Sequence, residues 1–157
     1  PLSAIGSHVN DSKVAPYAAK AALALFGTYG YEMNPNVLTE TEISDLAAHA
    51  ELYRKYHRDI IERGTLYHLC APHAGNYMCM QCVSQDKSTS LVLFMNKLKE
   101  LEQFRFLKLR GLDAGKRYHN TLDGCVHTGE YYMRVGLNLS NGWLTEFSHK
   151  LIILTEE

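Results

Sequence analysis

The feature that most constrains the fold is a change in hydrophobic spacing near Gly64. Before it, the apolar residues from Ile43 to Ile61 recur at helical spacing, and from Thr65 onward the period becomes two. One pattern suits a helix and the other a strand, because the side chains of the two elements repeat at different intervals. The sequence therefore predicts two parts, residues 1–64 with helices and residues 65–157 built from strands.

The first part is predicted to run strand–helix–strand–helix. Pro16 suits the first turn of an alanine-rich helix. Thr39-x-x-Glu42 forms a capping box that begins the last helix, and Gly64 ends it. The expected elements are a short buried strand over 3–9, a helix over 16–26, a strand over 28–33 and a helix over 39–64. Two such units cannot close a parallel sheet, which is normally buried on both faces, so this part is expected to belong to a larger structure.

The second part is predicted to be an antiparallel β-sandwich, because many short strands are separated by turn signals. The expected strands cover 65–69, 77–84, 90–95, 104–110, 116–120 and 147–154. The segment 90–95 is apolar on both faces, which suits a central strand. The predicted fold class is thus mixed α and β: a predominantly antiparallel β-sandwich preceded by a βαβα unit.

Charge and composition narrow the function classes. The formal net charge is −1 over 157 residues, which argues against nucleic acid or an anionic membrane as a partner. No apolar run approaches the roughly 20 residues of a membrane helix. The four cysteines are expected to be reduced, in a cytoplasmic protein. The N-terminus lacks signal-peptide features and begins with Pro1, so we expect a truncated or processed chain.

Six segments, in order, give the chain a family resemblance. They are PLSAIGSHVN (1–10), AALALFGTYGYEMN (21–34), the helix running into YRKYHRDIIERGTLYHLCAPH (53–73), NYMCMQCVSQDKSTSLVLF (76–94), LKLRGLDAGKRY (107–118) and YYMRVGL (131–137). With these segments the chain resembles the C-terminal end of a bacterial α-galactosidase of glycoside hydrolase family 36.

The resemblance implies a fold for each part. Residues 1–10 would be strand seven of a (β/α)8 barrel and residues 15–27 the helix after it. Residues 28–34 would be strand eight and 39–64 the final helix. Residues 65–157 would form the C-terminal sandwich.

The resemblance also implies an activity for the parent protein. The family hydrolyses terminal α-galactosides, such as melibiose and raffinose, with retention of configuration and without a cofactor. Its two catalytic aspartates lie on earlier barrel strands, so no catalytic residue is assigned here and the chain alone is expected to be inactive. Its partners would be the N-terminal and barrel regions of the same parent chain, and exposed barrel edges would favour self-association.

His8 and Asn10 are the candidate residues for the rim of the substrate pocket. By the resemblance they lie at the carboxyl end of a barrel strand, where barrel active sites are built. Glu32 and Asn34 have the analogous place on the next strand. The alternative is that His8 forms a local hydrogen bond that holds its loop.

Cys79-x-x-Cys82, with Cys70, His68 and His73 nearby, raises the possibility of a zinc site. Residues three apart in a strand point to opposite faces, and the chain has no second such motif. We therefore predict buried thiols and no metal. Other carboxylates, Asp59 with Glu62 on the helix and Asp86 in a turn, are expected to be solvated.

A rival interpretation is a non-catalytic carbohydrate-binding or assembly module. Tyr131, Tyr132 and Trp143 gather late in the chain, and aromatic rings form platforms for sugars. The alternative is packing, because aromatic residues are common in strands.

Overall fold

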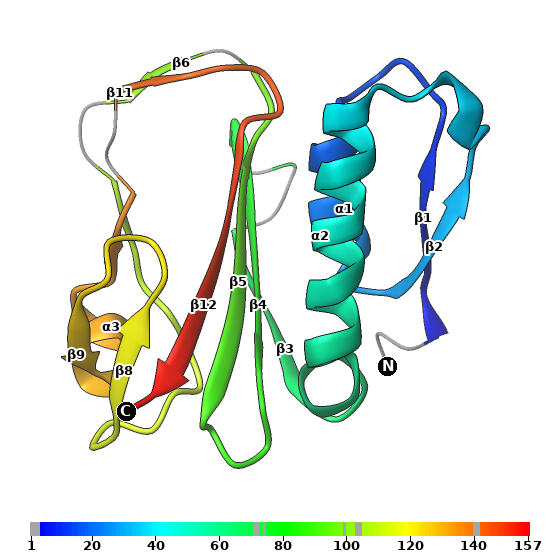
Figure 1. Ribbon diagram of the computed structural model, residues 1–157. Coiled ribbons are helices and arrows are strands. Elements are labelled where there is room, and N and C mark those ends of the chain that lie inside the picture. Colours follow the sequence, from blue (N-terminus) through cyan, green and yellow to red (C-terminus); the bar gives the residue numbers. More distant parts are fainter. Residues whose placement is uncertain (1–3, 71–72, 74, 99, 103–104, 140–141) are drawn as a thin grey trace. The chain divides into compact units, whose positions relative to one another are not determined.

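The structure is a computed structural model that describes residues 4–70, 73, 75–98, 100–102, 105–139 and 142–157; for 100–102 and 142–144 it describes the backbone only. Ser3, Phe104 and Asn141, which fall in predicted strands or turns, lie outside the described residues. The chain divides into two compact units, Pro1–Arg63 and Gly64–Glu157 (Figure 1). Each unit has a hydrophobic cluster of its own.

The first unit has the predicted strand–helix–strand–helix order. Its elements are β1 (Gly6–Asn10), α1 (Tyr17–Ala24), β2 (Thr28–Glu32), a 3-10 turn (Pro35–Val37), α2 (Glu40–Tyr56) and a π-helical turn (His57–Glu62). The strands β1 and β2 pair in parallel, with His8 opposite Gly30 and Asn10 opposite Glu32. Pro16 is the residue before α1 rather than its first helical residue.

Only one face of this small sheet is covered. Val9 is buried against Ala21, Ala24 and Leu46 of the two helices. On the other face His8, Asn10 and Glu32 are exposed. The prediction of a buried strand is therefore wrong for the described residues, because Val9 alone of β1 is buried.

The start of α2 confirms the predicted capping box. The Thr39 backbone N–H donates to Glu42 Oε2 at 2.8 Å, and the Glu42 N–H donates to Thr39 Oγ1 at 3.3 Å. The predicted apolar face is only partly buried: Leu46, Ile60 and Ile61 are buried, whereas Ile43 is half-exposed. The buried Ile60 and Ile61 lie in the π turn, whereas the exposed Ile43 lies near the start of α2, so the predicted stripe is not buried along its whole length.

The second unit is built on a six-stranded antiparallel sheet with the order β3-β4-β5-β12-β8-β9. The strands are β3 (Thr65–Cys70), β4 (Tyr77–Val83), β5 (Thr89–Asn96), β8 (Arg117–Asn120), β9 (Val126–Thr128) and β12 (His149–Glu156). The predicted central strand is confirmed, since β5 lies between β4 and β12 and is buried along seven of its residues, Ser90–Asn96.

A second layer covers one face of this sheet. It consists of α3 (Gly129–Arg134) and the pair β7 (Phe106–Leu107) with β10 (Leu137–Asn138). A further two-stranded pair is formed by β6 (Glu100–Glu102) and β11 (Gly142–Leu144). Leu107, Leu109 and Tyr132 pack in one cluster with Val92, Phe94 and Ile152 of the sheet. The mostly antiparallel fold is thus confirmed. The strand predicted over 104–110 is shorter, although Leu107 and Leu109 are buried and Lys108 and Arg110 exposed, as its alternation indicates.

Candidate functional site

The candidate site lies at the carboxyl ends of the parallel strands β1 and β2. Parallel pairing brings both of these ends to one edge of the sheet, and such edges are where α/β proteins build their sites. The register sets Asn10 beside Glu32 and His8 beside Gly30. These four positions share the face that the helices leave uncovered.

His8 is held by Glu32. Its Nδ1 lies 2.6 Å from Glu32 Oε1, a distance at which the ring N–H donates to the carboxylate. The ring lies over Gly30, because a Cβ added there would come within 2.9 Å of His8 Cδ2. Glycine at position 30 therefore makes room for the imidazole. Both alternatives for His8 remain compatible with this geometry: a local hydrogen bond, and a ring fixed for a ligand.

The end of β1 is fastened to α1 through Lys20. Lys20 Nζ donates to the carbonyl oxygen of Asn10 at 2.8 Å and also to that of Ser12. Asn10 Oδ1 in turn accepts from the Ser12 backbone N–H at 3.2 Å. Burial lowers the pKa of Lys20, an effect partly opposed by the charge of Asp11. Lys20 was not among the residues predicted from the sequence, although it lies in the first turn of α1 (Tyr17–Ala24) and follows the end of β1 by ten residues.

This arrangement suits binding rather than bond cleavage. Retaining glycoside hydrolysis needs two carboxyl groups about 5–5.5 Å apart, and Glu32 is the one carboxylate within β1 and β2. An imidazole fixed by a carboxylate, with an amide beside it, can exchange hydrogen bonds with the hydroxyl groups of a sugar.

The cysteines and histidines of the zinc hypothesis have unlike positions. Cys79 and Cys82 are both buried in β4, and only Cys79 belongs to the cluster between the layers. His68 and His73 are exposed. Among the described residues no group of three or more His, Cys, Asp or Glu side chains could hold a metal ion.

The aromatic residues of the rival interpretation have unlike positions. Tyr132 is fully buried, and its hydroxyl accepts from Asn120 Nδ2 at 2.9 Å and donates to the Tyr118 carbonyl at 3.2 Å. Tyr131 is half-buried and stacks on His127, with ring centroids 4.0 Å apart. The side chain of Trp143 lies outside the described residues. Tyr132 therefore serves packing and cannot be a sugar platform.

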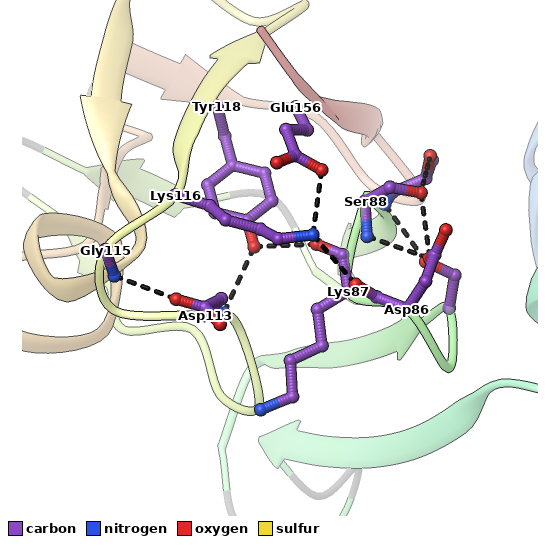
Figure 2. Close-up of polar contacts among 10 residues, drawn as sticks. Asp86, Lys87, Ser88, Asp113, Gly115, Lys116, Tyr118 and Glu156 are labelled. Carbon is purple, nitrogen blue, oxygen red and sulfur yellow. Dashed lines mark hydrogen bonds and ion pairs between the residues drawn. The ribbon is translucent and has the colours of Figure 1, made fainter.

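A polar cluster joins the β4–β5 turn to the end of β12 (Figure 2). Lys116 Nζ donates to Glu156 Oε2 at 2.8 Å and to the Asp86 carbonyl at 2.9 Å. The Tyr118 hydroxyl donates to the Lys87 carbonyl at 2.7 Å and accepts from the Asp113 backbone N–H at 3.1 Å. These bonds fasten loops to the sheet and, between Lys116 and Asp86, to one another, so this cluster is structural.

Asp86 is more than a solvated turn residue. It accepts hydrogen bonds from the Ser84 hydroxyl at 2.6 Å and from the Ser88 backbone N–H at 2.9 Å. These bonds, that from Ser84 foremost, lower the pKa of Asp86 to about 2. Asp59 and Glu62 are exposed, as predicted. Asp59 Oδ1 lies 4.0 Å from Arg63 Nη1, and Glu62 Oε1 lies 3.5 Å from His57 Nε2.

The chain shares its sequence pattern and its fold with known proteins. Residues 77–154 match the profile of the glycosyl hydrolase family 36 C-terminal domain. The chain belongs to glycosyl hydrolase family 36. Within family 36 it is 32% identical over 147 residues to alpha-galactosidase AgaA of Geobacillus stearothermophilus, covering 88% of this chain and 20% of that protein. It is 29% identical over 143 residues to alpha-galactosidase Mel36A of Lactobacillus acidophilus, covering 87% of this chain and 19% of that protein.

Solved structures of family 36 cover the whole chain. A variant of AgaA from Geobacillus stearothermophilus, solved in complex with raffinose, superposes with a TM-score of 0.93 at 29% identity and covers 100% of this chain and 22% of that one. The galactosidase domain of AgaSK superposes with a TM-score of 0.91 at 27% identity, with the same coverage. The chain thus spans about one fifth of the length of its curated relatives. No helix in the described part is long and apolar enough to cross a membrane.

Proposed function

We propose that this chain is the C-terminal part of a retaining α-galactosidase and is inactive when separated from the rest of that enzyme. Residues 1–64 would be the last two βα units of its (β/α)8 barrel, and residues 65–157 its C-terminal sandwich. The observation that carries the proposal is the likeness of the whole chain to family 36 α-galactosidases, including the AgaA variant bound to raffinose. The parallel pairing of β1 with β2 and their single covered face support it.

Activity measurements test this proposal directly. The full-length protein should release p-nitrophenol from p-nitrophenyl α-galactoside and galactose from melibiose and raffinose, with the α-anomer formed first. The 157-residue chain should do neither, and mixing it with the separately produced preceding part should restore hydrolysis. Hydrolysis by the chain alone would contradict the proposal, as would a folded full-length protein without activity.

Within this proposal His8 and Asn10 line the rim of the galactoside pocket, and Glu32 is a positioning residue. Their support is the exposed face at the carboxyl ends of β1 and β2 and the hydrogen bond that fixes the ring. In the full-length enzyme His8→Ala should lower kcat/KM about tenfold or more, which corresponds to about 1.4 kcal/mol. Glu32→Gln should raise KM more than it lowers kcat, because the ring keeps its place less well.

A control variant distinguishes the role of His8 and Glu32 at the pocket from a general loss of activity caused by any substitution. Glu40 is an exposed glutamate in the first turn of α2, outside the strand ends. Glu40→Gln should leave both kinetic constants unchanged. Unchanged constants in His8→Ala would instead assign His8 to the purely local hydrogen bond.

A further inference from the structure

An irregularity in the pairing of β3 with β4 determines which cysteines meet. The register is regular from Thr65 opposite Val83 to His68 opposite Met80, and then shifts by one residue. Had the regular register continued, Cys70 would face Met78. With the shift it faces Cys79.

The shift changes the face to which Cys70 points. In an antiparallel pair a slip of one residue moves a side chain to the other face of the sheet, and a bulge produces this slip locally. Cys79 belongs to the cluster between the two layers, and Cys70 packs against that same cluster. Two thiols therefore lie on one face at opposed positions. Cys82 pairs with Leu66 and Leu91 and is absent from this cluster, so the sequence motif Cys79-x-x-Cys82 does not identify the pair.

Opposed positions suit a disulfide. Directly opposed residues of antiparallel strands have Cα atoms about 4.5 or 5.5 Å apart. A disulfide accepts Cα separations of about 4.4–6.8 Å. The pairing of Cys70 with Cys79 is therefore of the kind that a disulfide can bridge.

The two thiols differ in access. Cys79 is fully buried, whereas Cys70 is half-buried and lines a hollow of about 430 Å³ together with Tyr77, Arg105 and Lys108. A small oxidant that enters this hollow meets Cys70 first. All four cysteines of the chain are present as thiols in the structure.

We propose that Cys70 and Cys79 form a disulfide when the protein meets hydrogen peroxide. The Cys70 thiolate attacks one peroxide oxygen, the O–O bond breaks, and a sulfenic acid and water result after proton uptake. The Cys79 sulfur then attacks the Cys70 sulfur, and the hydroxyl of the sulfenic acid leaves as a second water with the Cys79 proton. Two thiols lose two electrons and two protons, hydrogen peroxide gains them, and a dithiol such as dithiothreitol reverses the reaction.

The test is a map of disulfides in the full-length protein after treatment with hydrogen peroxide. Remaining thiols are alkylated under denaturing conditions, and chymotrypsin then cuts after Tyr77, so Cys70 and Cys79 fall on different peptides. We expect these two peptides to be joined, lighter by two hydrogen atoms than their sum, and to separate after dithiothreitol. The midpoint of urea unfolding should also rise on oxidation and fall again on reduction.

Two cysteine variants test whether Cys79 is the partner of Cys70. Cys79→Ala should abolish the linked peptides and leave a sulfenic acid at Cys70 that dimedone labels, whereas Cys82→Ala should keep the link. Persistence of the linked peptides in Cys79→Ala would overturn the proposal. So would a link between Cys79 and Cys82 in the unaltered protein, or alkylation of both Cys70 and Cys79 after peroxide. The unaltered protein and Cys82→Ala decide the matter even where Cys79→Ala does not fold.

Discussion

At the scale of single residues, the buried Asn120 makes several side-chain hydrogen bonds that hold the turn after β8. Its Nδ2 donates to Asp123 Oδ1 at 2.8 Å and to the Tyr132 hydroxyl at 2.9 Å, while its Oδ1 accepts from the Leu122 backbone N–H at 3.0 Å. Asn120→Ala should lower the free energy of unfolding by about 3 kcal/mol, because the buried Tyr132 hydroxyl and the groups of the turn after β8 lose their bonds to this buried side chain at once. Urea unfolding, monitored by circular dichroism, measures this loss of unfolding free energy.

The control for this variant is Asn36→Ala, which alters an exposed asparagine in the first unit. It should change the free energy of unfolding by less than about 0.5 kcal/mol. Equal losses in the two variants would show that the hydrogen bonds of Asn120 contribute nothing specific.

Asp86 gives a prediction about pH at the same scale. Its pKa of about 2 in the folded chain lies below the value of about 3.9 in an unfolded one. The ionised Asp86 carboxylate therefore stabilises the folded chain fully above pH 4, and this stabilisation is lost as the pH falls toward 2. Because Asp86 is exposed, we expect its ionised form to contribute less than about 1 kcal/mol to the free energy of unfolding.

Asp86→Asn removes this titration while keeping a side-chain acceptor for Ser84 and Ser88. The difference in unfolding free energy between the unaltered chain and Asp86→Asn should shrink between pH 4 and pH 2. A difference that stays constant from pH 6 to pH 2 would contradict the assignment.

At the scale of elements, the start of α3 depends on a close approach of two backbones. A Cβ on Gly129, the first residue of α3, would lie 1.9 Å from the Asp113 carbonyl oxygen. Gly129→Ala must displace the loop that Asp113 belongs to, and we expect a loss of about 3 kcal/mol in unfolding free energy. Gly75→Ala is the matched control, since nothing lies within 4 Å of its Cβ position. Thermal unfolding compares the two, and equal stability would refute the steric reason.

The elements also show what could be predicted from the sequence. The capping box at Thr39 and the apolar run in β5 are local signals, so their structures followed from the residues alone. The helix α3 was missed because Tyr131 and Tyr132 are typical of strands and Gly129 of turns. The meeting of Cys70 with Cys79 could not be predicted, because it depends on a register shift between two strands that no local pattern marks.

The candidate residues at the strand ends were proposed from the family resemblance and not from a local pattern. His8 and Asn10 were placed by family order, and the structure adds their surroundings, Glu32 and Lys20. The contact between His8 and Glu32 depends on the parallel register of two strands separated by a helix. Neither residue's neighbours in sequence contain that information.

At the scale of the whole molecule, the first unit presents an apolar hollow of about 380 Å³. It is lined by Tyr31, Met33, Pro35, Leu38, Ile43, Leu46 and Ala47. Ile43 is 50% exposed and nearby Val37 is 66% exposed. If the chain is part of a barrel, as proposed, the rest of the enzyme covers this surface. The chain produced alone should then self-associate through it, because exposed apolar patches recruit partners.

Substitution of one lining residue tests that expectation. Ile43→Lys places a charge in the hollow and should shift the sedimentation of the isolated chain toward the monomer. Leu98→Lys is the control, because Leu98 is also an exposed apolar residue, at 62%, but belongs to the other unit. A monodisperse monomer of the unaltered chain at tens of micromolar would contradict the prediction. An equal response to the two substitutions would place the association elsewhere on the molecule.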